Sequence, residues 1–177
     1  MPEFLRKLSP LAFLTLVVLV AVTLLVVTES FTGPVVEKRL QQQIIDQMEG
    51  MFPNVSDWEF EDDLYTLYTN SEKIGYAFLA TGAGYHGEIS ILVGLEDAET
   101  VKGVVILSQT ETPGVGSRIT EPDFLNQFIG VSIDDIALSQ DGGLIDGLTG
   151  ATISSRAVVD AVKQTAMDKV AQIEGTE

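Results

Sequence analysis

The sequence lacks cysteine altogether and has a single histidine, His86, among its 177 residues. Without cysteine, this chain has no disulfide bonds, thiolate nucleophiles or cysteine-ligated iron–sulfur clusters. One histidine alone cannot build a multi-histidine metal site or a bis-histidine haem, so we expect no metal centre. Any redox chemistry in this chain must therefore reside on an organic cofactor.

Positive charge is also scarce, with 10 Lys and Arg against 26 Asp and Glu and a net charge of −16. In the first 33 residues Glu3 and Glu29 balance Arg6 and Lys7, so the remainder carries the whole excess. Such an acidic surface argues against nucleic acid as a partner. Its simplest interpretation is a solvated face that favours solubility and avoids anionic lipid headgroups.

One long uncharged run, Ser9–Thr28, is dominated by Leu, Val, Ala and Phe. About twenty such residues match the thickness of a bilayer core. Arg6 and Lys7 precede the run, and the positive-inside rule predicts a cytoplasmic N-terminus with the rest outside. A cleaved signal peptide is the alternative, but the apolar core is longer than usual and no small-residue cleavage site follows. We predict an uncleaved, single-pass anchor in the cell membrane at residues 1–30.

The remaining chain is predicted to hold a short linker at residues 31–34 and one extracytoplasmic domain at residues 35–177. Hydrophobic periodicity and turn residues predict its elements. The expected helices and strands are, in order, a helix at 35–50, strands at 64–69, 73–80, 88–95 and 101–108, a short helix at 121–128 and a strand at 133–138. A C-terminal helix completes the domain. This order predicts an α+β fold with helices packed on an antiparallel or mixed sheet.

The most informative stretch is Asp146–Ser155, a run of small residues that leads into the C-terminal helix. A helix N-terminus offers unpaired N–H groups and a positive dipole end, which suit a phosphate. Gly150 and Ala151 would let a phosphate approach the backbone, and Thr152 adds a hydroxyl. Alternatively, the run only caps the helix, with Thr152 or Ser154 as N-cap. Short motifs of this kind do not decide between the two.

The helix that follows has an apolar stripe and a clear stop signal. Gly175 is its expected end. The stripe recurs at intervals of three or four residues, which is the helical period, and comprises Val158, Val162, Ala166, Val170 and Ile173.

Two further loops are rich in glycine. Glu111–Gly116 contains Pro113-Gly114, a type II turn signal, and is by itself typical of an ordinary turn between elements. The segment Gly82–Gly87 lies between two predicted strands and contains Tyr85 and His86. Tyr85 is either a surface or core aromatic or a residue that flanks a planar ligand.

Two motifs in order, ETPGVG at 111–116 and DGLTGAT at 146–152, resemble a known family. It is the FMN-binding domain shared by the G subunit of Rnf-type electron-transport complexes and the C subunit of Na⁺-translocating NADH:quinone reductases. The resemblance implies FMN bound covalently, through a phosphoester, to Thr152. It also implies further cofactor-binding residues, namely Asp146, Thr149, Gly150, Ala151, Glu111, Thr112 and Gly114.

The resemblance further implies an electron-carrying subunit of a membrane-bound ion-translocating oxidoreductase, with other subunits and the lipid bilayer as partners. No base stands near Thr152 in the sequence, so attachment would require an FAD:protein FMN transferase, and we expect no catalytic residue in this chain. The C subunit is usually longer, which favours the G type. The alternatives are that C subunit, a freestanding FMN-binding protein, and an anchored interaction or assembly domain without a cofactor.

Overall fold

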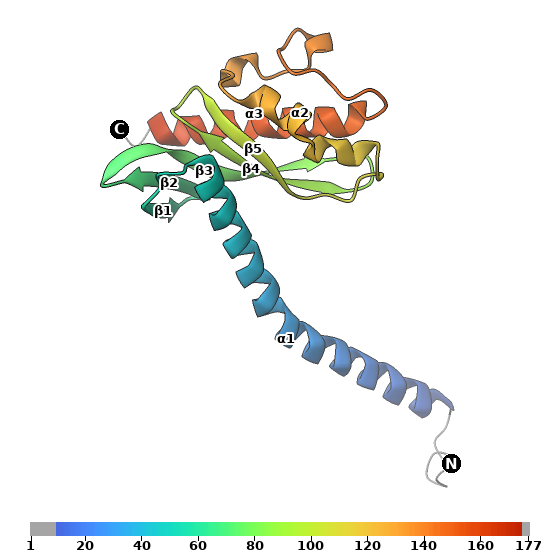
Figure 1. The fold of residues 1–177 in the computed structure, drawn as a ribbon. Helices are drawn as coiled ribbons and strands as arrows, with labels where there is room; N and C mark the ends of the chain where they lie inside the picture. The colour runs from blue at the N-terminus through green and yellow to red at the C-terminus, as the bar shows by residue number, and fades with distance from the viewer. Residues whose placement is uncertain (1–9, 175–177) are drawn as a thin grey trace. The chain divides into compact units, whose positions relative to one another are not determined.

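The computed structural model describes residues 10–174 (Figure 1). Its first element, α1, is a continuous helix over Pro10–Met51. Within it, Ala12–Glu29 has a mean hydropathy of 2.5, and it is the one described segment long and apolar enough to span a membrane. The chain divides into two compact units between Gln42 and Gln43, inside this helix.

The linker expected at residues 31–34 is helical, so the predicted break in secondary structure is wrong. Gly33 and Pro34 lower helix stability, yet neither forbids a helix whose neighbours on both sides favour one. The end of α1 agrees with the sequence, because Phe52-Pro53-Asn54 follows its last residue. The assignment of residues 1–30 as anchor and 35–177 as a separate domain remains a prediction.

Within the described residues the second unit contains a five-stranded sheet in the order β1-β2-β3-β4-β5. Each strand pairs antiparallel with the next, which confirms the expected α+β class. The strands span β1 Asp57–Glu61, β2 Leu64–Thr69, β3 Glu72–Ala83, β4 Glu88–Leu95 and β5 Val101–Ser108. The predicted strands at 64–69, 88–95 and 101–108 are confirmed, and the one at 73–80 extends to Ala83.

Two-residue turns join the first three strands. Asn70 and Ser71 connect β2 to β3 with φ of 49° and 71°, and Asp62 and Asp63 connect β1 to β2 with φ of 49° and 59°. Positive φ at both positions is typical of type I′ turns, whose twist matches that of a hairpin. β1 was not predicted, because its acidic residues have low strand propensity and all five of its residues are exposed at the sheet edge.

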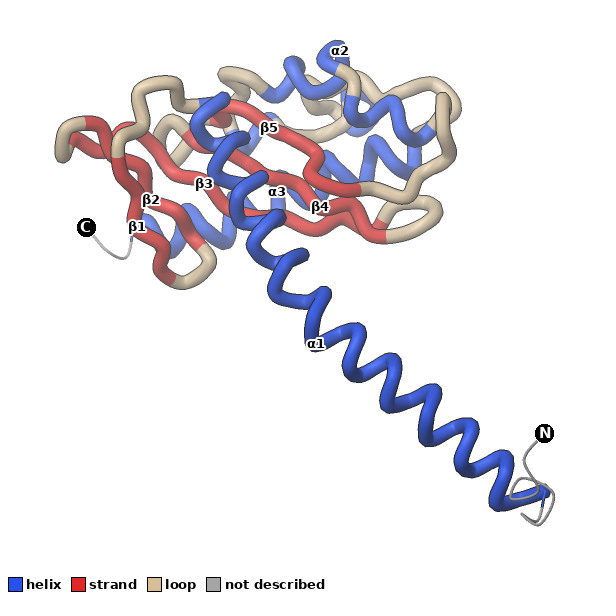
Figure 2. Tube along the Cα trace, turned by 60° about the horizontal axis from the view of Figure 1, so that its bottom comes forward, coloured by secondary structure: helices blue, strands red, loops and turns tan. Residues whose placement is uncertain are grey.

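Helices cover both faces of the sheet (Figure 2). On one face, α3 (Thr152–Glu174) packs on the main core, and Val158, Val162, Ala166 and Ile173 of the predicted stripe are buried there. On the other face, Ile44, Met48 and Phe52 from the end of α1 and the residue after it join a smaller cluster. That cluster is completed by Leu67, Ala77 and Leu92 from the strands.

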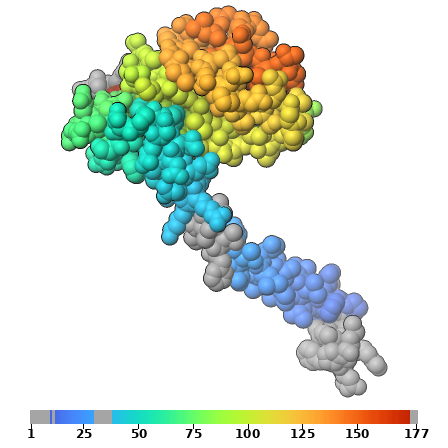
Figure 3. Space-filling view, viewed as in Figure 1, coloured from blue at the N-terminus to red at the C-terminus, as the bar shows by residue number. Residues whose placement is uncertain are grey.

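The segment between β5 and α3 forms one continuous part of the surface, coloured yellow to orange in Figure 3. Its short helices are η2 Gly116–Thr120, α2 Pro122–Leu125, η3 Asn126–Phe128, η4 Ile133–Asp135 and η5 Ser139–Asp141. The helix predicted at 121–128 is thus confirmed as α2 followed by η3. The predicted strand at 133–138 is wrong, because Ile133, Ile136 and Leu138 enter the core from 3₁₀ and irregular backbone rather than from a ladder.

Gly82 of β3 sets how closely α3 approaches the sheet. A Cβ at Gly82 would lie 2.5 Å from the carbonyl oxygen of Ala157 in α3. By contrast, a Cβ at Gly50, in the last turn of α1, would meet nothing within 4 Å. Close packing of α3 therefore requires the smallest residue at position 82.

We predict that Gly82→Val pushes α3 away from β3 and lowers the free energy of unfolding by about 1–3 kcal/mol, as overpacking does. Thermal or denaturant unfolding followed by circular dichroism measures the change. Gly50→Ala is the matched control and should leave stability unchanged or raise it slightly. Equal unfolding midpoints for Gly82→Val and the unmodified protein would contradict this account of the packing.

Candidate functional site

The turn that leads into α3 explains the need for Gly150. The Ala151 amide donates to the Leu148 carbonyl over 2.9 Å, and Gly150, at the third position, has φ of 82°. This is the geometry of a type II turn, where glycine is preferred. A Cβ at Gly150 would contact only Val115 Cγ1, at 4.0 Å. The backbone conformation is therefore enough to account for glycine here.

Side chains hold this turn from both ends. The buried Ser155 hydroxyl accepts from the Leu148 amide and donates to the Ala151 carbonyl, each over 3.0 Å. At the other end, Gln127 accepts from the Asp146 amide over 2.7 Å and donates to its carbonyl over 3.3 Å. The side chains of Asp146 and Thr149 remain exposed. The motif is therefore a fixed scaffold with an accessible outer surface.

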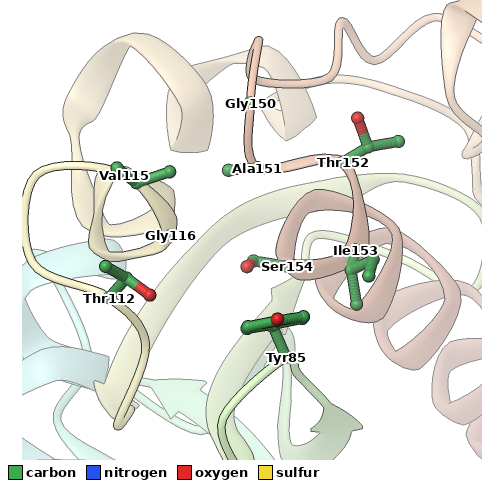
Figure 4. Close-up of a pocket in the computed structure, with 9 residues that line it drawn as sticks. All are labelled: Tyr85, Thr112, Val115, Gly116, Gly150, Ala151, Thr152, Ile153 and Ser154. Atoms are coloured by element: carbon green, nitrogen blue, oxygen red, sulfur yellow. The ribbon is translucent and has the colours of Figure 1, made fainter.

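The helix begins at Thr152, so the serine and threonine proposed as caps take other roles. Ser154 lies within the first turn, where it is 2% exposed and donates its hydroxyl to the Glu111 carboxylate. Thr152 is exposed, and in Figure 4 its hydroxyl points away from Ser154 and Tyr85. The helix start thus has two buried hydroxyls, those of Ser154 and Ser155, and one accessible hydroxyl, that of Thr152.

An open hollow of about 400 Å³ lies beside this helix start (Figure 4). Its volume falls in the range of about 300–1,000 Å³ common for small-molecule sites. Three segments form it, namely the turn after β3, the loop after β5 and the N-terminus of α3. The lining residues are Tyr85, Thr112, Val115, Gly116, Gly150, Ala151, Thr152, Ile153 and Ser154.

The loop after β5 forms the turn that the sequence predicts. The Val115 amide donates to the Thr112 carbonyl over 3.1 Å, and Gly114 has φ of 73° in the third position after Pro113. The Ser117 hydroxyl accepts from the Gly114 amide over 2.9 Å and holds the turn in place. Thr112 thereby faces the hollow, whereas Gly114 lies outside its lining.

Glu111 lies next to the hollow but is only 5% exposed. Its carboxylate accepts from the Ser154 hydroxyl and, over 2.9 Å, from the His86 amide. Burial by itself raises the pKa of the carboxyl group. Hydrogen bonds from Ser154 and from the amides of His86 and Tyr85 outweigh burial, so the pKa of Glu111 lies below its ordinary value of 4.5.

Tyr85 completes the wall of the hollow, and His86 follows it in the chain. Tyr85 is 66% exposed, and its ring meets the His86 ring edge-on at a centroid distance of 4.8 Å. His86 Nδ1 lies 3.2 Å from the Thr112 hydroxyl. Among residues 10–174, no group of three or more metal-ligating side chains converges.

The structure brings together four of the eight predicted cofactor residues, Gly150, Ala151, Thr152 and Thr112, around the hollow. Glu111 lies beside them, whereas Gly114, Thr149 and Asp146 do not line it. Sequence reasoning singled out Tyr85 and the loop 111–116, which contains Val115 and Gly116, but missed Ile153 and Ser154 as wall residues. Both stand directly after the second motif, so proximity to that motif was the available signal.

Comparisons with known proteins identify the family to which this sequence is similar. The family model of the FMN-binding domain matches residues 84–166, which include both motifs. The G subunit of the ion-translocating oxidoreductase complex of Methanosarcina acetivorans is 34% identical over 177 residues, covering 91% of this chain and 94% of that protein. The corresponding G subunit of Aliivibrio fischeri is 32% identical over 182 residues, covering 85% and 84%. The crystal structure of Shewanella oneidensis NqrC shares the fold, with a TM-score of 0.50 and 22% identity over 68% of this chain and 70% of that one.

We predict that Gly150→Val destabilises the turn before α3 by about 1–3 kcal/mol, because a β-branched residue is strained at positive φ. Gly150→Asn is the matched variant and should cost less, since asparagine tolerates this conformation. Thermal unfolding of the two proteins measures the difference. An equal loss of unfolding free energy in the Val and Asn variants would show that the space around position 150, and not its φ, decides which residue is tolerated.

We also predict that Glu111→Gln lowers the free energy of unfolding by about 2 kcal/mol at pH 7, because a hydrogen-bonded charge is lost. Since the pKa of Glu111 is lowered in the folded state, its stabilising effect is complete above its ordinary value of 4.5 and is lost as the pH falls through the folded value. The difference between the two proteins should therefore shrink in acid.

Unfolding at pH 7 and at several values below 4.5 measures this dependence. Glu61→Gln on the exposed edge strand β1 is the matched control, for which we expect no such loss. A difference between Glu111→Gln and the unmodified protein that stays constant with pH would refute a stabilising charge at Glu111.

Proposed function

The chain belongs to the G-subunit family of ion-translocating oxidoreductase complexes and contains an FMN-binding domain, and from this membership we propose that Thr152 holds FMN covalently. The attached flavin would make this subunit an electron carrier within a membrane complex. The observation that carries the proposal is an exposed threonine hydroxyl at the first residue of α3, beside an open hollow.

The N-terminus of α3 suits a phosphate. The first turn of this 23-residue helix has amides without intrahelical partners, and the helix dipole places positive charge there. A phosphoester on Thr152 would keep its negative charge close to both. Because this side chain is exposed, its hydroxyl oxygen is accessible and can attack a phosphorus atom.

The hollow suits a flat aromatic ring system. Tyr85, Val115 and Ile153 line it, and these large side chains are 66%, 43% and 54% exposed. A bound isoalloxazine ring would cover such surface and remove it from water. Thr112 adds a hydroxyl that can bond to a polar edge of the ring or of the ribityl chain. When bound, the flavin supplies the electron-carrying chemistry that no side chain here provides.

The surroundings of Thr152 support attachment in trans. In the described part of the chain, neither a carboxylate nor an imidazole is hydrogen-bonded to its hydroxyl, and in our proposal the base comes from another protein. An FAD:protein FMN transferase would move the FMN part of FAD to the Thr152 oxygen and release AMP, with the hydroxyl proton taken up by the transferase. The exposed Asp146 and Thr149 would be contacts for that enzyme.

The apolar helix Ala12–Glu29 fits a membrane-anchored subunit of such a complex. In our proposal the N-terminus is cytoplasmic and the FMN domain lies on the other side of the membrane, as the flanking Arg6 and Lys7 indicate. Outside the cytoplasm a dissociable flavin would be lost, and a covalent bond prevents this loss. The partners would be the other subunits of the complex, which exchange electrons with the flavin.

We predict that Thr152→Ala abolishes flavin attachment, whereas Thr152→Ser, which keeps the hydroxyl, retains it. The protein is co-expressed with an FAD:protein FMN transferase and analysed by in-gel flavin fluorescence after denaturation and by intact mass. The unmodified chain should gain the mass of one FMN less one water. Thr66→Ala on β2, far from the motifs in sequence, is the control and should be labelled normally.

Normal labelling of Thr152→Ala would refute the attachment site. An unlabelled, colourless protein in the presence of an active transferase would refute covalent FMN altogether. That second result favours an anchored interaction or assembly domain, which needs no flavin. Release of flavin on denaturation would instead indicate a noncovalent FMN-binding subunit.

A further inference from the structure

We infer that Glu111 is a positioning residue that orients the first turn of α3 through Ser154 and thereby turns Thr152 outward for modification. The inference rests on the proposed attachment of FMN at Thr152. It assigns Glu111 a role through another residue, in place of the direct contact with the cofactor that the family resemblance implies.

The first support is that three separate segments meet at one buried carboxylate. Glu111 belongs to the loop after β5, Ser154 to the start of α3 and His86 to the turn after β3. One carboxylate oxygen accepts from the Ser154 hydroxyl and the other from the His86 amide. Glu111 is 5% exposed and Ser154 2%, so the contact is shielded from water. A buried, charge-assisted contact of this kind is geometrically demanding.

The second support is the tight space around this contact. A Cβ at Gly116 would lie 2.8 Å from Glu111 Oε2 and 3.0 Å from Ser154 Oγ. A Cβ at Gly84 would lie 2.5 Å from Glu111 Oε1. Two glycines from different loops thus leave just enough room for the carboxylate in one position, which fixes where Ser154 must lie.

The third support comes from helix geometry. Residues two apart on an α-helix point about 200° away from each other, since each residue turns the helix by about 100°. When Glu111 holds Ser154 inward, Thr152 is therefore turned toward the opposite, outer side, as Figure 4 shows. The negative charge of Glu111 near the first turn of α3 also has the sign that stabilises a helix start.

The existing contacts of the carboxylate argue against a direct contact with FMN. Both oxygens of Glu111 already accept hydrogen bonds from this chain. Glu111 lies next to the hollow but does not line it. Of its two contacts, the one with Ser154 is the one through which Glu111 can act on α3.

The test compares Glu111→Gln, Ser154→Ala and the double variant in the full-length, detergent-solubilised protein. A control with similar loss of stability is Val162→Ala, which removes buried apolar atoms further along α3. Two experiments are made: amide hydrogen exchange of the unlabelled protein, read at Ser155, whose amide donates to the Ala151 carbonyl, and steady-state kinetics, which give kcat and KM for FMN transfer from FAD by the purified transferase. The exchange measurement does not require flavin.

We expect Glu111→Gln and Ser154→Ala each to speed exchange in the first turn of α3 and to lower kcat about tenfold, because a small misplacement of the acceptor oxygen is costly. KM should change little, since the exposed outer surface of the motif is intact. The double variant should lose no more than either single variant, as expected for two residues that act as one unit. Val162→Ala should leave both readouts close to those of the unmodified protein.

Unchanged exchange in Glu111→Gln and Ser154→Ala would overturn the inference, and so would wild-type kcat. Equal loss of kcat in Val162→Ala would also overturn it, because general destabilisation would then explain the effect. If the unmodified chain itself accepts no FMN, the proposed function fails. The exchange data alone then decide whether Glu111 orders the helix start.

Discussion

The packing of α3 against the sheet is the constraint on which the rest of the domain depends. Val158 and Val162 are fully buried on the sheet, and Gly82 lets the helix backbone come close to β3. This packing fixes the position of the helix start next to the turn after β3 and the loop after β5. The hollow and the hydroxyl of Thr152 are consequences of where the helix lies.

Much of the fold is readable from local pattern. The strands at 88–95 and 101–108 have apolar residues at strand spacing, and the C-terminal helix has a clean apolar stripe, so both classes of element are correct. β1 was not predicted because its acidic residues have low strand propensity. Among the described residues, only β2 pairs with it. The segment 133–138 was read as a strand because its apolar residues suit either structure, and only tertiary packing decides between them.

The candidate site, like the fold, could be predicted from the sequence only in part. Thr152 and Thr112 could be selected from the sequence because each belongs to a motif. Ser154 could not, since its burial and its contact with Glu111 join residues 43 positions apart, which no local pattern reveals. The structure adds a second reason for Gly150, because the turn needs positive φ whether or not a ligand is present. The motifs thus identify candidate positions, whereas the contacts in the folded structure indicate what each residue does.

Chain order adds a consequence for biosynthesis. α3 follows every strand that it covers, and Lys169 near its end donates to the Asp62 carbonyl across 107 positions. When only the strands have been synthesised, the apolar face of the antiparallel sheet that α3 later covers is still exposed to water. The hydroxyl of Thr152 gains its surroundings only when α3 docks on the sheet. If FMN is attached there as we propose, the acceptor site would be complete only after the last helix has been synthesised and packed.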